Sequence, residues 1–482
     1  MTKLLLALGL LLLGAPQAAR PNILWIVVDD MSANFGCYGD KSVETPNVDR
    51  LAREGTRFST AFVTAPVCSP SRSALITGMF QTSIGAHHHR SGRGTDKIHL
   101  PPGVDTIPAL FRRAGYFTSI GSWPITRAQG KTDYNFEWDK ADYDSTDWAD
   151  RKAGQPFFAQ VQLHGGKLRD GRGLSDAVKK ALGTLTSTDV VKLPPYYPDD
   201  PVIREDWARY LDSVRYTDLQ VGEILKRLEA EGTAAHTLLF FITDHGISHA
   251  RGKQFLYDEG VHIPLLVRGP GMTAGAVRAD LIQHVDLAAS SLAAAGIPIP
   301  QGMQSRDVLA ADYRPREAVF AARDRCDETV EHLRMVRTSK WKYIRNFLPK
   351  RPHLQPNAYK DAKPIVRRLR ELHDSGKLTG LPEQILFAPE RAPEELYDLE
   401  NDPSEVRNLA ADPSHETTLK ELRGRLDRWM EETGDQGRVP ESAARYDSDM
   451  AVYLSELGKS PEKVKILQDN IALMKKWAAE GK

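Results

Sequence analysis

The residues with the clearest chemical potential lie in the short segment Cys68-Ser69-Pro70-Ser71-Arg72. Pro70 suits the first turn of a helix, where its missing N–H costs no hydrogen bond, and the residues up to Thr77 continue that helix. Cys68 would then lie at a helix N-terminus, which favours an anion, and Arg72 could face the same anion one turn later. These features together indicate chemistry on an oxyanion. The alternative is a buried, unreactive cysteine, which is the more common case for a lone cysteine at a helix start.

A second set of polar residues follows two apolar runs, residues 22–28 and residues 237–243. Such runs are typical of strands buried on both faces of a parallel sheet, and α/β sheets bind ligands at the carboxyl ends of their strands. Adjacent carboxylates repel each other unless a cation compensates, and their oxygen atoms suit Ca²⁺ or Mg²⁺. We therefore expect the polar residues at the two strand ends to bind one divalent cation: Asp29, Asp30, Asp244 and His245.

The pattern Cys-x-Pro-x-Arg, followed by Thr77-Gly78, resembles the signature of the formylglycine-dependent sulfatases. In that family the cysteine is oxidised after synthesis to formylglycine, whose hydrate is the nucleophile. The two strand ends and the stretch Thr45 to Ala52 are also similar to the family, nearest in pattern to heparan N-sulfatase-type and bacterial glycan sulfatases. The resemblance implies that Ca²⁺, or alternatively Mg²⁺, also binds the modified Cys68.

The resemblance further implies basic residues around the reacting group. Lys253 matches a lysine that binds sulfate in the family, and Arg72 and Lys131 would share this task. Lys131 follows an insertion relative to the family pattern, so a loop lysine without function is the alternative. Asp133 stands where the family has histidine, and we expect it to contact the substrate. Positive charge at these positions would stabilise the sulfuryl group as it transfers.

The proton donor for the leaving group is left open by the sequence. The family's strand ends in His-x-Pro-His, whereas this chain has His164-Gly165-Gly166-Lys167 after the strand-like run 155–163. Either His164 or Lys167 could therefore be the acid, because the choice depends on geometry.

Three further residues are expected to line the substrate. His87 begins a run of three histidines, which could instead bind a transition metal, although consecutive side chains point in different directions. Asp324 and Arg325 follow a strand predicted at residues 319–322 and could select the substrate.

The composition limits the partners. The 482 residues include 64 Lys plus Arg and 64 Asp plus Glu, so no global charge favours nucleic acid or a membrane surface. Residues 1–19 have the pattern of a signal peptide. The alternative is a membrane anchor, which is disfavoured because the apolar run is too short to span a bilayer stably. We expect an exported, periplasmic or secreted protein, matured by a formylglycine-generating or anaerobic enzyme. Of the three cysteines, Cys37 and Cys326 are expected to be free, and a disulfide between them is the alternative.

The resemblance implies an alkaline-phosphatase-like α/β fold with a mixed central sheet between helices, which we assign to residues 20–315. Residues 316–482 would form a smaller C-terminal subdomain. Strand-like segments there predict a small antiparallel sheet, covered by a helix whose apolar face comprises Leu419, Leu422, Leu426 and Trp429. Asp286 is expected to cap a helix, and residues 349–393 are not assigned.

These features together predict a sulfatase that hydrolyses sulfate esters, or N-sulfate, of a sulfated carbohydrate such as a glycosaminoglycan. One alternative is a phosphodiester or phosphonate monoester hydrolase of the same superfamily, which would share Cys68, Arg72 and the metal ligands. Another is an inactive relative that only binds sulfated glycans.

Overall fold

The computed structural model describes residues 20–169, 174–457 and 460–482, so the predicted signal peptide lies outside the described residues. Its central sheet has eight strands in the order β3-β4-β1-β5-β6-β2-β7, and β8 pairs with β2. The strands are β1 (Asn22–Val28), β2 (Thr56–Phe62), β3 (Phe117–Gly121), β4 (Phe157–Leu163), β5 (Thr237–Thr243), β6 (His262–Arg268), β7 (Ala276–Arg278) and β8 (Ile282–Gln283).

The predicted strand ends meet at one edge because β1 is the middle of a parallel group. It pairs in parallel with β4 on one side and β5 on the other, whereas β6 runs antiparallel to β5. All residues of β4 and β5 are buried, as the apolar run of β5 predicts. The mixed α/β sheet that the sequence predicts is therefore confirmed.

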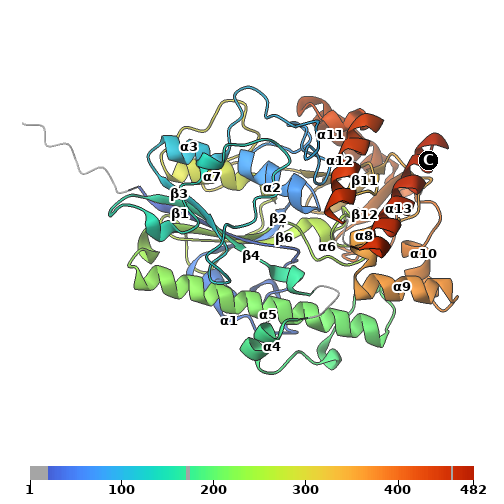
Figure 1. Cartoon of the computed structure of the whole chain (residues 1–482), viewed down its shortest axis with the longest axis horizontal. Helices are drawn as coiled ribbons and strands as arrows, with labels where there is room; N and C mark the ends of the chain where they lie inside the picture. The colour runs from blue at the N-terminus through green and yellow to red at the C-terminus, as the bar shows by residue number, and fades with distance from the viewer. Residues whose placement is uncertain (1–19, 170–173, 458–459) are drawn as a thin grey trace, which may run out of the picture.

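Helices cover both faces of this sheet. In Figure 1, α2, α3 and α7 lie above it, and α1, α4 and the long α5 lie below it. The helices of this part are α1 (Pro46–Glu54), α2 (Cys68–Thr77), α3 (Ile107–Arg113), α4 (Asp176–Leu182), α5 (Pro201–Ala230), α6 (Asp258–Val261) and α7 (Asp286–Ala294). The cap predicted at α7 is wrong: Asp286 is the first helical residue, and its carboxylate accepts from the N–H groups of Gln283 and Arg306.

A four-stranded antiparallel sheet, in the order β12-β11-β10-β9, forms the core of the C-terminal part. Its strands are β9 (Val319–Arg323), β10 (Leu333–Arg337), β11 (Trp341–Asn346) and β12 (Glu394–Asp398). Helix α11 (Glu416–Glu432) packs its predicted apolar face on this sheet, and the Trp429 ring stacks on Phe320 at 5.1 Å. The predicted sheet and its covering helix are confirmed.

The remaining helices lie around this second sheet. They are α8 (Ala358–Asp361), α9 (Pro364–Asp374), α10 (Gly380–Leu386), α12 (Ala443–Glu456) and α13 (Pro461–Ala479). The main hydrophobic core continues across residue 315, since Val319 and Met335 pack in the same cluster as Trp25 of β1. The domain boundary at residue 315 stays a prediction. In the described part of the chain, no helix combines the length and apolarity that crossing a bilayer requires.

Candidate active site

Four segments far apart in the sequence bring the predicted site residues together. β1 ends before Asp29 and Asp30, β5 ends before Asp244, and α2 begins at Cys68. The loop after β4 lies directly on the end of β1, where the N–H of Gly166 donates to the Asp29 carbonyl at 2.9 Å. A side chain at Gly165 would put its Cβ 2.2 Å from the Asp29 carbonyl oxygen, so this close approach requires glycine.

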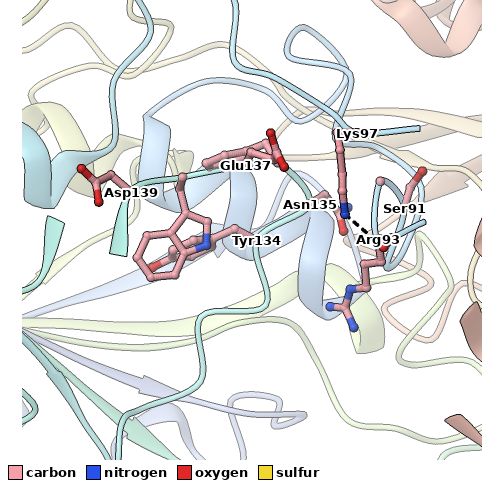
Figure 2. A pocket seen from close by; sticks show the side chains of 10 residues that line it. Ser91, Arg93, Lys97, Tyr134, Asn135, Glu137 and Asp139 are labelled. Carbon is pink, nitrogen blue, oxygen red and sulfur yellow. Dashed lines mark hydrogen bonds between the residues drawn. The ribbon is translucent and has the colours of Figure 1, made fainter. Parts of the chain in front are cut away.

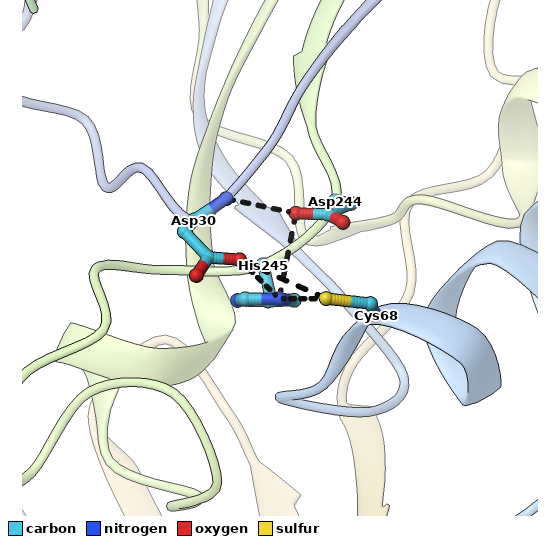
Figure 3. A group of neighbouring side chains, drawn as sticks. All are labelled: Asp30, Cys68, Asp244 and His245. Atoms are coloured by element: carbon cyan, nitrogen blue, oxygen red, sulfur yellow. Dashed lines mark hydrogen bonds and ion pairs between the residues drawn. The ribbon is translucent and has the colours of Figure 1, made fainter. Parts of the chain in front are cut away.

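Asp30, Cys68, Asp244 and His245 form a compact group with metal-ligating atoms, all within 4.8 Å of one another (Figure 3). The His245 Nε2 atom lies 3.2 Å from both the Cys68 Sγ atom and an Asp30 carboxylate oxygen. Its Nδ1 atom lies 2.9 Å from the carbonyl oxygen of Gly246, a contact that leaves Nε2 for a ligand.

The charges of this group fit a divalent cation. Burial by itself would raise the pKa of Asp30, but the ammonium groups of Lys253 and Lys167 hold it well below its ordinary value. Burial likewise opposes the charged form of His245, yet Asp244 and the neighbouring anions raise its pKa to about 10. The raised pKa of His245 means that the group stabilises positive charge. Its two carboxylates and one imidazole therefore suit an ion such as Ca²⁺ or Mg²⁺.

Asp29 is engaged differently from the other predicted metal ligands. Its carboxylate pairs with Arg72 and lies 3.3 Å from Lys131 Nζ and 2.7 Å from Lys167 Nζ. These cations hold the pKa of Asp29 well below its ordinary value, although burial opposes this. Asp29 therefore belongs to a basic cluster beside the four-residue group, and its role as a metal ligand stays a prediction.

The sulfur of Cys68 is surrounded by positive charge. Lys253 Nζ lies 3.2 Å from Sγ and Lys167 Nζ lies 3.8 Å from it. Burial raises the pKa of the Cys68 thiol, but Lys131, Lys167 and Lys253 outweigh burial and lower it to about 7. The N-terminus of α2 and three lysines thus make this position one that stabilises negative charge.

Arg72 is held rigidly, as an anion-binding arginine must be. Its Nε atom donates to Asp244 at 3.0 Å, and one terminal nitrogen donates to the side-chain oxygen of Gln162 at 2.6 Å. Gln162 was not identified from the sequence. The available signal was the pair of glutamines, Gln160 and Gln162, in a strand-like run that is otherwise apolar, where an unpaired amide would be costly.

Three predicted substrate residues are not brought to this cluster. The Arg325 guanidinium is fully buried and pairs with Glu441 and Asp449, and Asp324 accepts a hydrogen bond from Arg334. The ring of His87 packs on its neighbour His88. A buried guanidinium needs such partners, so the expected reach of Arg325 toward Cys68 is not observed. A role in substrate binding stays a prediction for His87, Asp324 and Arg325.

Tyr359 is a site residue that the sequence analysis missed. It belongs to α8, in the unassigned segment 349–393, and its hydroxyl donates to Asp30 Oδ2 at 3.0 Å. Lys253 Nζ lies 4.7 Å from the centre of its ring. No periodicity or motif marks a tyrosine in a four-residue helix, so only the tertiary structure identifies it.

Replacing Tyr359 by phenylalanine removes this hydrogen bond and keeps the ring. We expect divalent-metal affinity to fall by about 10- to 100-fold, because residues that support a metal ligand typically contribute that much. Competition with a chelating dye would measure the change. Tyr196→Phe is the control, since Tyr196 donates to Glu259. Unchanged metal affinity in Tyr359→Phe would show that this contact does not support the metal site.

The mixed sheet and the cluster at its strand ends have the arrangement of the alkaline-phosphatase-like fold, and comparison with known proteins identifies the family. The Sulfatase family model matches residues 21–297, and the model for the C-terminal region of N-sulphoglucosamine sulphohydrolase matches residues 245–352. The chain therefore belongs to the sulfatase family. It is a sulfuric ester hydrolase of a family that uses formylglycine and a divalent metal.

Individual relatives extend over most of the chain. An ulvan-active sulfatase of Formosa agariphila is 32% identical over 88% of this chain and 77% of its own length. Human N-sulphoglucosamine sulphohydrolase is 28% identical over 88% of this chain and 93% of its own. The fold is shared by a solved 2-O GAG sulfatase (TM-score 0.62, 21% identity, 89% and 96% covered). A phosphonate monoester hydrolase of Agrobacterium radiobacter also has it (TM-score 0.61, 16% identity, 86% and 96% covered).

Proposed function

We propose that this protein removes sulfate from a sulfated carbohydrate, O-linked or N-linked, such as a glycosaminoglycan, by means of a formylglycine at Cys68. The observation that carries the proposal is the position of Cys68 itself. It begins α2, lies within 4 Å of two lysine ammonium groups, and belongs to the Asp30, Asp244 and His245 group. The relatives named above supply the substrate class.

Asp30, Asp244 and His245 would hold the divalent cation, which we propose to be Ca²⁺. A cation there would lower the pKa of a hydroxyl group of the hydrated aldehyde at position 68, and that hydroxyl would be the nucleophile. The protein would be exported and matured by a formylglycine-generating or anaerobic enzyme.

The chain's own residues would bind and orient the sulfate. Arg72 is fixed by Gln162 and Asp244, and Lys253 is fixed by Asp30 at 3.0 Å, so their charges need no rearrangement during the reaction. Lys131, which is 28% exposed, completes the positive surface at the entrance. Preorganised charge of this kind stabilises the sulfuryl group during transfer.

Lys167 is the better placed of the two candidate acids. Its Nζ atom lies 3.8 Å from the Cys68 sulfur, and Asp29 raises its pKa well above the ordinary value although burial opposes this. His164 is exposed to solvent, and the partial desolvation of its ring together with Lys167 and Lys131 lowers its pKa, although Asp29 opposes this. At neutral pH, Lys167 therefore carries the proton that the leaving oxygen or nitrogen needs.

We expect Lys167→Ala to lower kcat/KM for a sugar sulfate by about 10²- to 10⁴-fold, the usual contribution of a general acid. For 4-nitrophenyl sulfate the loss should be smaller than about tenfold, because nitrophenolate leaves without protonation. His164→Ala is the matched control, and it should change kcat/KM for the sugar sulfate and for 4-nitrophenyl sulfate by less than about tenfold each. Equal losses on the two substrates would assign Lys167 to sulfate binding instead.

The substrate class is tested by anion release. Ion chromatography would follow sulfate and phosphate from heparin-derived and ulvan-derived fragments and from a phosphodiester. Sulfate from at least one glycan supports the proposal and names the substrate group. Phosphate alone would place the protein with the phosphoesterases that share its fold, and glycan binding without any release would indicate a binding protein.

A further inference from the structure

Two adjoining cavities lie beside the candidate active site. The first, of about 610 Å³, extends along residues 91–97 and 134–139, and the second, of about 450 Å³, includes Lys131 and Asp133 in its wall. Arg93, Tyr134 and Trp138 line both, so the two form one continuous hollow. Each has the size of a small-ligand site, and the second opens at a lysine that contacts Asp29.

The hollow has a basic end and an acidic end. In Figure 2, Arg93 and Lys97 lie at one end and Asp139 lies at the other, with the Glu137 carboxylate between them. The Lys97 ammonium is exposed and donates to the Arg93 carbonyl at 3.1 Å, which leaves further N–H donors for a ligand. An anionic group would therefore bind at the Arg93 and Lys97 end and be repelled from the other.

A line of alternating charges joins the basic end to the Cys68 cluster. Arg93 pairs with Asp133, whose carboxylate lies 3.5 Å from Lys131 Nζ. Lys131 in turn lies 3.3 Å from Asp29, beside Arg72. An anionic group bound at the basic end would thus be held in fixed relation to a sulfate at Cys68.

The side of the hollow between its two ends is aromatic and rigid. Trp138 is half-buried and packs edge-on against Tyr134 at 5.5 Å and Tyr143 at 5.9 Å. The hydroxyl groups of these two tyrosines are 2.8 Å apart and lock the pair. A fixed indole with an accessible apolar surface suits the C–H face of a sugar ring, because its apolar area is buried at little cost in side-chain entropy.

We propose that this hollow binds a second sugar residue of a sulfated oligosaccharide while the reacting sulfate lies at Cys68. The ring of this second sugar would pack on Trp138, and its sulfate or carboxylate would bind Arg93 and Lys97. The proposal rests on the carbohydrate substrate proposed above. It makes the protein selective for oligosaccharides over monosaccharides, and it excludes a further anionic group beside Glu137 and Asp139.

Titration calorimetry on the full chain tests this without requiring turnover. The probes are sulfated monosaccharides and tetrasaccharides prepared from heparin and from ulvan. We expect one tetrasaccharide to bind at least about tenfold more tightly than its monosaccharide. Lys97→Ala and Trp138→Ala should each remove most of that gain and change monosaccharide affinity by less than about twofold. Trp138→Phe should restore part of it.

Lys140→Ala is the control, since Lys140 is an exposed lysine outside the hollow, and it should bind like the wild type. Equal affinity for both lengths, no binding of either tetrasaccharide, or a length effect that survives both alanine variants would overturn the proposal. Sulfate release measured on the same probes separates the two proposals. Sulfate release that is equally efficient from monosaccharides and tetrasaccharides would support the sulfatase function and reject the subsite. Tetrasaccharide binding that depends on Trp138, without any sulfate release, would support the subsite and reject the sulfatase function.

Discussion

Replacing Cys68 by alanine is expected to lower sulfate release by a factor on the order of 10⁴ or more, to the background of the assay. Removing the nucleophile from an assembled site has effects of this size, because the remaining groups only bind and orient the substrate. The structure surrounds this one sulfur with Lys253, Lys167 and His245, all within 3.8 Å. Initial rates of sulfate release, with circular dichroism to confirm folding, would measure the loss.

Cys37→Ser is the matched control. Cys37 is also a free thiol, but burial and the Asp49 carboxylate raise its pKa to about 12, so it stays protonated and inert. We expect its activity to remain within about twofold of the wild type. Retention of more than about one hundredth of the activity in a folded Cys68→Ala variant would contradict the assignment of the nucleophile.

Asp30→Asn should abolish binding of the divalent metal. We expect the rate of sulfate release to fall by at least about 10²- to 10³-fold, because a metal stabilises transition-state charge by several kcal/mol. Asp30 is fully buried and contributes one oxygen to the four-residue group. The asparagine keeps the shape of the side chain and removes its charge. Metal content by mass spectrometry, before and after dialysis against a chelator, gives a readout that is independent of activity.

Asp133→Asn is the control for this prediction. Asp133 is also a carboxylate paired with a lysine of the cluster, but it pairs with Arg93 as well and is outside the four-residue group. It should keep its metal and lose activity only through the displacement of Lys131. Full metal occupancy in Asp30→Asn, or equal metal loss in both variants, would refute the proposed ligand group.

The elements that carry the site could be predicted because their signals are local. The apolar runs of β1 and β5 are long enough to be strands buried on both faces, and each stops where charged residues begin. The segment from Cys68 has the proline and the small polar residues of a helix start, and α2 begins at Cys68 as expected. The sequence alone therefore places the two strand ends at one edge of a sheet and Cys68 at a helix start, whereas the resemblance to the sulfatases brings Cys68 to the metal site.

The remaining features depend on side-chain partners, which have no local signal. Asp29 and Asp30 are neighbours in sequence, yet one faces Arg72, Lys131 and Lys167 and the other joins the four-residue group. Arg325 was expected near Cys68 because it follows a short strand, but its partners Glu441 and Asp449 lie more than a hundred residues away in sequence. Tyr359 reaches Asp30 from a segment without periodicity. Only the folded chain defines these contacts.

In the proposed function, sulfate release depends on a formylglycine at Cys68. The most direct test prepares the protein with several degrees of maturation and measures two quantities in each sample. One is the fraction of Cys68 converted to the aldehyde, by mass spectrometry of its peptide, and the other is the initial rate of sulfate release. The rate is expected to rise in proportion to the converted fraction and to extrapolate to zero when Cys68 is unmodified. Release at the full rate from unconverted protein, or none from fully converted protein on any sulfated glycan, would contradict the proposed function.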